Sequence, residues 1–155
     1  MQSHVFLLAG RKSSGDPVLE QVPVEHLGGS TYRLTATPGL ALGCAEADVV
    51  TVAEDGSFEV EKRGGNLGVL FFGANLVDVI GPLRNAFDRI GGRTAAPDDS
   101  SLVVATVSVS VGFEAVESAI RQGLINSVGV EWFYGNVYDE HDQPLNWWLP
   151  RPASE

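Results

Sequence analysis

The spacing of apolar residues changes near the middle of the chain, and this change constrains the fold more than any other feature. Before Gly64-Gly65, apolar and polar residues alternate in short runs separated by glycine-rich turns, a pattern typical of β-strands. After this point, apolar residues also recur at intervals of three and four, a pattern typical of helices that pack on a sheet. The sequence therefore predicts an α+β fold with a β-rich first part and a mixed second part.

The first part contains five predicted strands and no predicted helix. Gly28-Gly29 and the turn at 54–56 join neighbouring strands as hairpins. Short strands linked by tight turns predict a small all-β lobe over residues 1–65, which is either a curled sheet or an open barrel. The predicted strands span residues 4–9, 19–26, 31–37, 48–53 and 57–62.

The second part alternates strands with two helical patterns. Strands are predicted at residues 67–72, 93–96, 102–111 and 130–138, helices at 76–90 and 113–128, and a turn at 97–100. Pro82 fits the first helix if that helix begins near residues 77–79, because the missing N–H then falls in or near the first turn. The order β-α-β-β-α-β predicts a ferredoxin-like unit over residues 66–139, with both helices on one face of the sheet.

Charge and cysteine content exclude several classes of function. The chain has 155 residues and a formal charge of −10, so nucleic acid and anionic membranes are poor partners, whereas a basic protein is favoured. Its single cysteine, Cys44, excludes an intramolecular disulfide and suits a reducing compartment. The N-terminus lacks a basic region before its short apolar run, and no window approaches the ~20 apolar residues of a membrane span. We therefore expect a cytoplasmic protein.

The C-terminal segment concentrates aromatic and acidic residues. Trp147 and Trp148 lie in a proline-flanked tail, predicted over residues 140–155, which has no reason to carry two large apolar side chains unless they dock. They dock either onto their own domain or onto another chain. Alternation along the last predicted strand places Trp132, Tyr134 and Tyr138 on one face, where Trp132 and Tyr134 are expected to anchor the core or the junction between the two parts.

No residue pattern indicates catalysis or a bound cofactor. His141 and the acids beside it are metal-ligand types, but no further ligands are evident, so a solvated acidic loop is expected and no metal. Cys44 lies among small apolar residues and is expected near the core rather than as a nucleophile, which would need a nearby base. The residues predicted to bind a partner are Trp147, Trp148, Asp139, Glu140 and Asp142.

Several turn and core residues together resemble a known bacterial family. These are Tyr32 before the Pro38 turn, the glycine-rich bend around Gly43, the strand start Asp48-Val49-Val50, and Gly65-Asn66. In these features residues 25–139 resemble the domain family of unknown function numbered 4265. The resemblance implies a fold and carries no activity.

Two classes of function are consistent with these observations. The first is a non-enzymatic, acidic module that binds another protein; its most specific form is an immunity protein that neutralises a basic toxin. The alternative is a small-molecule-binding regulatory or enzymatic domain with a cleft between its two parts. The acidity, the aromatic tail and the absence of catalytic motifs favour the first class. The sequence does not predict an oligomeric state.

Overall fold

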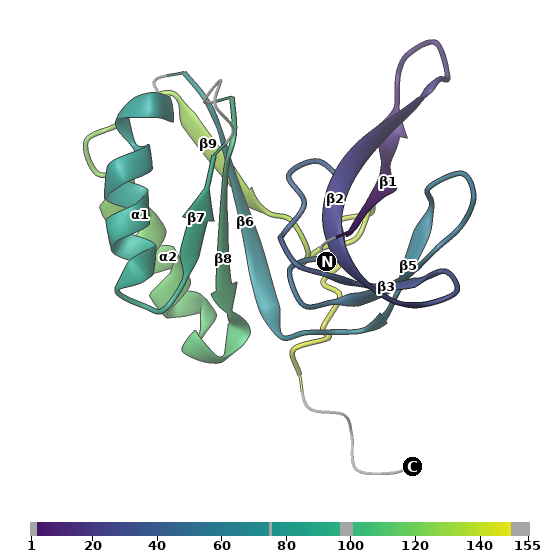
Figure 1. Cartoon of the computed structure of the whole chain (residues 1–155). Coiled ribbons are helices and arrows are strands. Elements are labelled where there is room, and N and C mark those ends of the chain that lie inside the picture. The colour runs from purple at the N-terminus through teal and green to yellow at the C-terminus, as the bar shows by residue number, and fades with distance from the viewer. Residues whose placement is uncertain (1–2, 75, 97–100, 150–155) are drawn as a thin grey trace.

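The protein has an α+β fold. The computed structural model describes residues 3–74, 76–96 and 101–149 (Figure 1). These residues form two antiparallel sheets and two α-helices. The turn predicted at 97–100 and residues 150–155 of the predicted tail lie outside the described residues. No helix in the described ranges is both long enough and apolar enough to cross a membrane.

The first sheet contains five strands that follow one another in chain order. Each strand pairs antiparallel with the next, and the inward side chains Leu7, Val24 and Val50 form a buried cluster. The third strand ends at Leu34, earlier than predicted, because residues 35–48 leave the sheet as a long loop. The strands are β1 (Ser3–Arg11), β2 (Pro17–Gly28), β3 (Thr31–Leu34), β4 (Val49–Val52) and β5 (Phe58–Lys62).

This sheet curls until its first strand meets the turn between β4 and β5. The backbone N–H of Leu8 donates to the carbonyl of Gly56 over 2.8 Å. Gly56 has a φ of +90°, and a Cβ at this position would lie 2.8 Å from Leu19 Cδ2 and 3.2 Å from the Leu8 nitrogen. Only glycine combines this backbone conformation with such a close approach.

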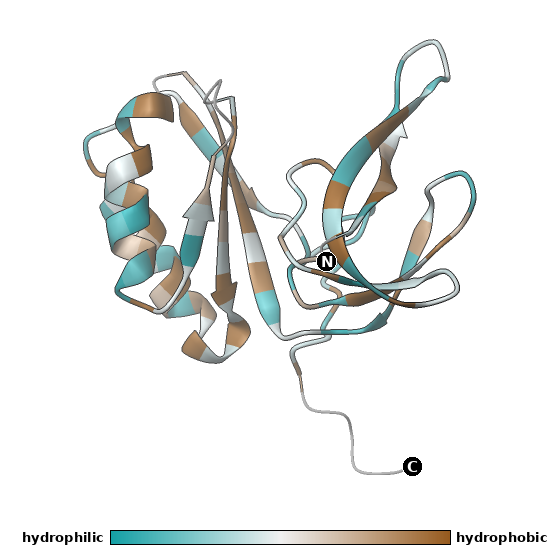
Figure 2. Ribbon diagram, in the orientation of Figure 1, coloured by the Kyte–Doolittle hydropathy of each residue, from teal (hydrophilic) through white to brown (hydrophobic). Residues whose placement is uncertain are grey.

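The second sheet contains four strands in the order β7-β8-β6-β9, so β8 and β6 are central. Both helices lie on the face that points away from the first sheet (Figure 1). Phe71, Phe87 and Ile120 are buried in one cluster between this face and the helices, and Figure 2 shows the apolar residues of β6 and β8 in brown. The elements are β6 (Asn66–Gly73), α1 (Ile80–Asp88), β7 (Arg93–Ala95), β8 (Val103–Ser108), α2 (Phe113–Gly123) and β9 (Val130–Tyr134).

Both helices are shorter than predicted. A 3₁₀ turn, Leu76–Asp78, precedes α1, and Pro82 is the third residue of α1, where its missing N–H breaks no intrahelical bond. α2 ends at Gly123, because the N–H and the hydroxyl of Ser127 both bond to the carbonyl of Leu124 and turn the chain. Val128, the last residue of the second predicted helix, therefore lies outside α2 and is 77% exposed.

The strands β8 and β9 also end earlier than predicted. β8 stops at Ser108, whose hydroxyl accepts from the N–H of Ser110 and begins a 3₁₀ turn. β9 stops at Tyr134, because the Asn136 side chain accepts the N–H of Gly68, and the chain leaves the edge of the sheet. As a result Tyr138 is 49% exposed, and the prediction that it continues the face of Trp132 was wrong.

Candidate functional site

The loop at residues 35–48 packs onto the face of the second sheet that the helices leave open. The hydroxyl of Thr106 on β8 donates to Thr37 over 2.7 Å. A Cβ at Gly68 would lie 2.8 Å from Thr37 Cγ2, and a Cβ at Gly39 would lie 2.5 Å from Leu102 Cδ2. Glycine at these two positions therefore lets the loop and the sheet approach closely.

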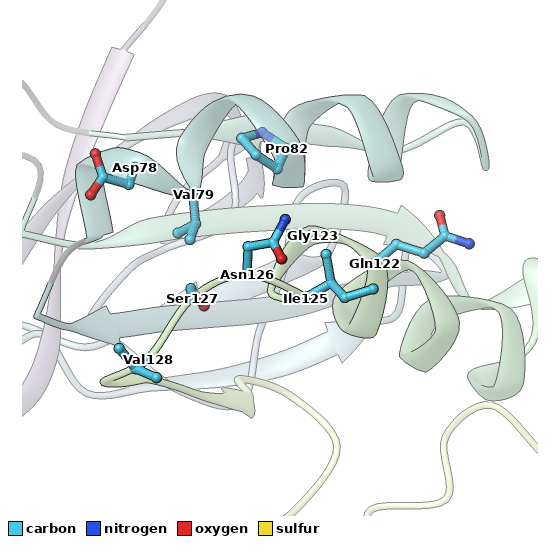
Figure 3. Close-up of a pocket in the computed structure, with 9 residues that line it drawn as sticks. All are labelled: Asp78, Val79, Pro82, Gln122, Gly123, Ile125, Asn126, Ser127 and Val128. Atoms are coloured by element: carbon cyan, nitrogen blue, oxygen red, sulfur yellow. The ribbon is translucent and has the colours of Figure 1, made fainter.

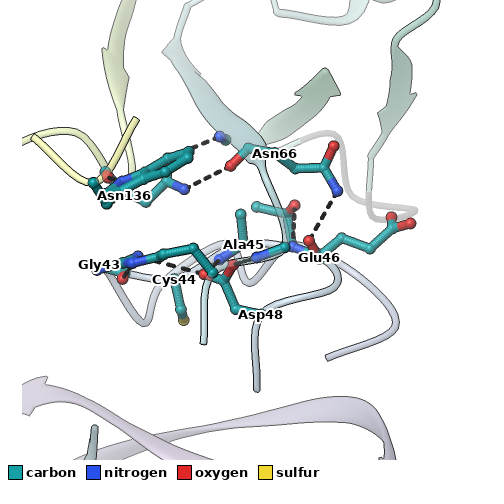
Figure 4. Close-up of polar contacts among 12 residues, drawn as sticks. Gly43, Cys44, Ala45, Glu46, Asp48, Asn66 and Asn136 are labelled. Atoms are coloured by element: carbon teal, nitrogen blue, oxygen red, sulfur yellow. Dashed lines mark hydrogen bonds and ion pairs between the residues drawn. The ribbon is translucent and has the colours of Figure 1, made fainter. Parts of the chain in front are cut away.

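Asp48 fixes the end of this loop. Its carboxylate is 1% exposed and accepts the N–H groups of Ala45 over 2.9 Å and Gly64 over 2.7 Å, with the Arg63 guanidinium 3.4 Å away. Burial raises the pKa of Asp48 above its usual value, although the two N–H bonds and Arg63 oppose this shift. These bonds tie Ala45 in the loop to Arg63 and Gly64 after β5, so Asp48 holds the loop in place (Figure 4).

A second set of bonds joins the loop to the end of β9. The side-chain amide of Asn136 is 0% exposed; it donates to the Asn66 carbonyl over 2.8 Å and accepts the N–H of Gly68 over 3.0 Å. Asn66 in turn donates to the carbonyl of Glu46 over 2.9 Å, and Glu46 pairs with Arg93. Figure 4 shows Asn66 between Asn136 and Glu46.

Cys44 is buried beneath this junction and is not poised for nucleophilic chemistry. Its side chain is 1% exposed and packs in the core of the first sheet. Burial raises the pKa of the Cys44 thiol, and the negative charges of Asp48 and Glu20 raise it further. The thiolate, which is the reactive form, is therefore disfavoured.

The tail docks onto its own chain. The indole N–H of Trp147 donates to the carbonyl of Asn136 over 2.8 Å, and the Arg63 guanidinium lies 5.5 Å from a Trp147 ring centroid. Trp148 packs edge-on against Trp147 and against Phe113 at the start of α2, with ring centroids 5.5 and 5.3 Å apart. Both tryptophans are half-buried against the core of the second sheet, so in this structure they support the tail.

Asp139, Glu140 and Asp142 lie in an exposed turn between Tyr138 and Pro144. Asp139 accepts the N–H groups of His141 over 2.8 Å and Gln143 over 3.0 Å, and these bonds lower the pKa of Asp139. Glu140 and Asp142 are exposed. Within the described ranges, no three His, Cys, Asp or Glu side chains converge as metal ligands do. The absence of a bound metal stays a prediction.

Two adjacent hollows open beside this turn. Their volumes are about 410 and 380 Å³, and they share Leu42, Tyr138 and Asp139. Leu42 is 51% exposed and Tyr138 49% exposed. We call this region the Leu42–Tyr138 surface. Its other lining residues are Gly43, Phe58, Val60, Arg63, Glu140 and Leu145 in the first hollow, and Glu117, Trp132, Phe133, Tyr134, Gly135 and Asp142 in the second.

The predicted binding residues therefore separate into two groups. Asp139, Glu140 and Asp142 line the Leu42–Tyr138 surface, whereas Trp147 and Trp148 line neither hollow. Sequence reasoning missed the exposed apolar side chains Leu42 and Phe133. Leu42 carries one weak signal, since it is a large apolar residue in a glycine-rich loop with no strand or helix period.

A third hollow lies at the other end of the second sheet. It is small, about 160 Å³, and opens between the start of α1 and the end of α2 (Figure 3). Asp78, Pro82 and Asn126 line it beside the exposed side chain of Ile125. Its volume is below the several hundred Å³ typical of small-molecule sites.

Comparisons with known proteins identify the family. Residues 20–131 match the family described as "Domain of unknown function (DUF4265)". The chain belongs to the DUF4265 family. This finding confirms the resemblance inferred from the turn and core residues. The DUF4265 match covers the loop at residues 35–48 and β9 up to Glu131, and it leaves the acidic turn and the docked tryptophans outside.

One solved structure shares the fold of this DUF4265 domain. It is a hypothetical protein from Neisseria gonorrhoeae, with a TM-score of 0.61 and 14% sequence identity, and the match covers 87% of this chain and 94% of that chain. At this identity the likeness concerns the fold alone. No protein with a curated description matches the sequence.

Proposed function

We propose that this protein is a non-enzymatic module that binds a basic protein through the Leu42–Tyr138 surface. One observation carries the proposal: two adjacent hollows share half-exposed apolar side chains, and carboxylates line both hollows. Leu42, Tyr138 and Asp139 line both hollows. Apolar and aromatic anchors inside a charged rim are typical of protein-binding sites.

The charge of this surface favours a basic partner. Glu117, Asp139, Glu140 and Asp142 all line the hollows. The one arginine there, Arg63, already donates to the carbonyl of Gly43 over 2.8 Å and lies over Trp147. A net charge of −10 adds a long-range field that accelerates the approach of a cationic protein and is screened by salt.

The most specific form of the proposal is an immunity protein that neutralises a basic toxin. The test co-expresses the chain with the product of the neighbouring gene and measures growth and complex formation. Leu42→Ser with Tyr138→Ser should abolish the complex and its protection, because it removes both apolar anchors. The control Ile125→Ser removes a more exposed apolar side chain elsewhere, 77% exposed, and should leave both intact. A double variant that binds and protects like the wild type would contradict the proposal.

A second candidate function is small-molecule binding in the larger hollow. Its volume of about 410 Å³ is within the range of ligand sites. Apolar side chains of Phe58, Val60 and Leu145 line it. Native mass spectrometry of the purified protein tests this alternative. A stoichiometric small molecule that is lost on Val60→Asp would favour it over protein recognition.

We further propose that the chain comprises an all-β lobe over residues 1–65, a ferredoxin-like unit over 66–139 and a tail over 140–155. The element order β-α-β-β-α-β and the strand order β7-β8-β6-β9 support the ferredoxin-like assignment. The bond between Leu8 and Gly56 supports an open barrel for the first lobe. Expression of residues 66–149 alone tests the division, since a ferredoxin-like unit with its own core should fold.

A further inference from the structure

The strand β9 has one edge that no other described strand covers. It pairs with β6 alone and ends the sheet. The bonds Gly135 N–H to Gly68 O and Ala74 N–H to Gly129 O flank this pairing. Because bonding alternates along an antiparallel pair, Glu131 and Phe133 bond toward β6. The N–H and C=O groups of Trp132 and Tyr134 then point to the free edge.

The smaller hollow of the Leu42–Tyr138 surface runs along this free edge. Four consecutive residues, 132–135, line it. Successive side chains of a strand point to opposite faces, so a hollow lined by consecutive residues lies beside the edge rather than on one face. Glu117 of α2 lines it from the helix side, and Leu42 lines it from the loop that packs on the opposite face.

The charges around the edge select the occupant. Glu117, Asp139 and Asp142 line the hollow, and no lysine, arginine or histidine of the described ranges does so. The one charged residue of β9 itself, Glu131, is exposed. A second copy paired edge to edge would bring these acids together, which disfavours self-association, whereas a cationic segment would offset them.

We propose that the basic partner adds an extended segment to β9 as a further antiparallel strand. This inference rests on the proposed function and specifies its geometry. Residues opposite each other in an antiparallel pair share a face. Partner residues opposite Trp132 and Tyr134 therefore carry lysine or arginine toward Glu117, and the residues between them carry apolar side chains toward Phe133 and Leu42. Recognition by strand addition combines main-chain bonds with such alternating side-chain contacts.

The geometry predicts which backbone groups of the partner are needed. The partner residues opposite Trp132 and Tyr134 form hydrogen-bonded pairs with β9. These are the basic residues, and their backbone N–H groups donate to β9. The backbone N–H groups of the apolar residues between them point away from β9. The probe is a capped peptide of alternating lysine and valine, titrated into the ¹⁵N-labelled full chain. Binding should shift the amide resonances of Trp132 and Tyr134 and slow their hydrogen exchange.

Two N-methylated peptides provide the decisive comparison. N-methylation of the lysines removes the N–H groups that face β9 and should weaken binding about tenfold or more. N-methylation of the valines keeps the same charge and should change affinity little. Equal binding by both methylated peptides would overturn strand addition and leave the proposed recognition of a basic protein intact. Loss of binding only with methylated valines would overturn the antiparallel register.

Two further outcomes complete the test. A glutamate–valine peptide that binds as well as the lysine–valine peptide would contradict recognition of a basic partner, and with it both proposals. Sedimentation of the full chain without peptide should show a monomer; a dimer in which the exchange of Trp132 and Tyr134 is already slowed would make a second copy the occupant and overturn the inference.

Discussion

Replacement of both tail tryptophans tests how the tail is held. In Trp147→Ala/Trp148→Ala the chain loses the bond from the Trp147 indole to the Asn136 carbonyl and the edge-on packing of Trp148 against Phe113. Both side chains are half-buried against the core of the second sheet. The replacement leaves the acidic residues of the exposed turn unchanged. A loss of stability therefore reports on the docking of the tail and not on the charges of the Leu42–Tyr138 surface.

The magnitude follows from burial and hydrogen bonding. Full burial of a large apolar side chain contributes about 1.5–3 kcal/mol, so two half-buried tryptophans contribute about 2 kcal/mol together. The hydrogen bond to Asn136 adds about 1 kcal/mol. Release of the tail returns some backbone entropy and offsets part of this loss. We therefore expect the free energy of unfolding to fall by about 2–3 kcal/mol.

Urea denaturation followed by far-ultraviolet circular dichroism measures this loss, since tryptophan fluorescence changes with the substitution itself. With an m-value of about 2 kcal/mol/M, the midpoint should fall by about 1–1.5 M. The control Leu149→Ala, at a side chain 54% exposed on the same tail, should change stability by less than about 0.5 kcal/mol. An unshifted urea midpoint in the double variant would show that the docked tryptophans do not stabilise the fold.

Three further predictions test the fold. Gly56→Ala should cost about 1–3 kcal/mol more than Gly15→Ala, because both glycines have φ near +90° but only Gly56 has neighbours that a Cβ would strike; equal losses would contradict the curling of the first sheet. Asp48→Asn should destabilise by about 1–3 kcal/mol, because an amide cannot accept all the bonds of the carboxylate. Burial raises the folded-state pKa of Asp48 above 3.8, so on acidification the folded state binds the proton first and gains stability that the variant lacks. The free energy of unfolding of the wild type should therefore exceed that of Asp48→Asn by more near pH 4 than near pH 7. A smaller excess near pH 4 would contradict the raised pKa of Asp48. Amide exchange should be slowest along Val103–Ser108 and its partner β6, the central strands, and faster exchange there than in β9 would contradict the strand order.

The local elements were predictable because their signals are local. Spacings of three and four placed both helices, and the strand predicted at residues 102–111 contains β8. The errors lie at element ends, where one side chain competes with the regular hydrogen bonds. Ser127 ends the turn after α2 and Asn136 ends β9, and neither residue type by itself marks a boundary.

The candidate surface was only partly predictable. The acids Asp139, Glu140 and Asp142 stood out by composition, and they line the hollows. Leu42 and Phe133 did not stand out, because a large apolar residue is normally expected to be buried. Their exposure depends on how residues 35–48 pack on the second sheet.

The sequence by itself determined the α+β class, the negative charge, the membership of the DUF4265 family and the aromatic character of the tail, since composition and short periods carry these properties. Only the tertiary structure decided where the tail docks, which strand has a free edge and which acids share a hollow with Tyr138. Asn136 bonds to Gly68 and Asn66, which are 68 and 70 residues away. Contacts over such separations depend on how two sheets and a loop pack together, and no local period of the sequence encodes them.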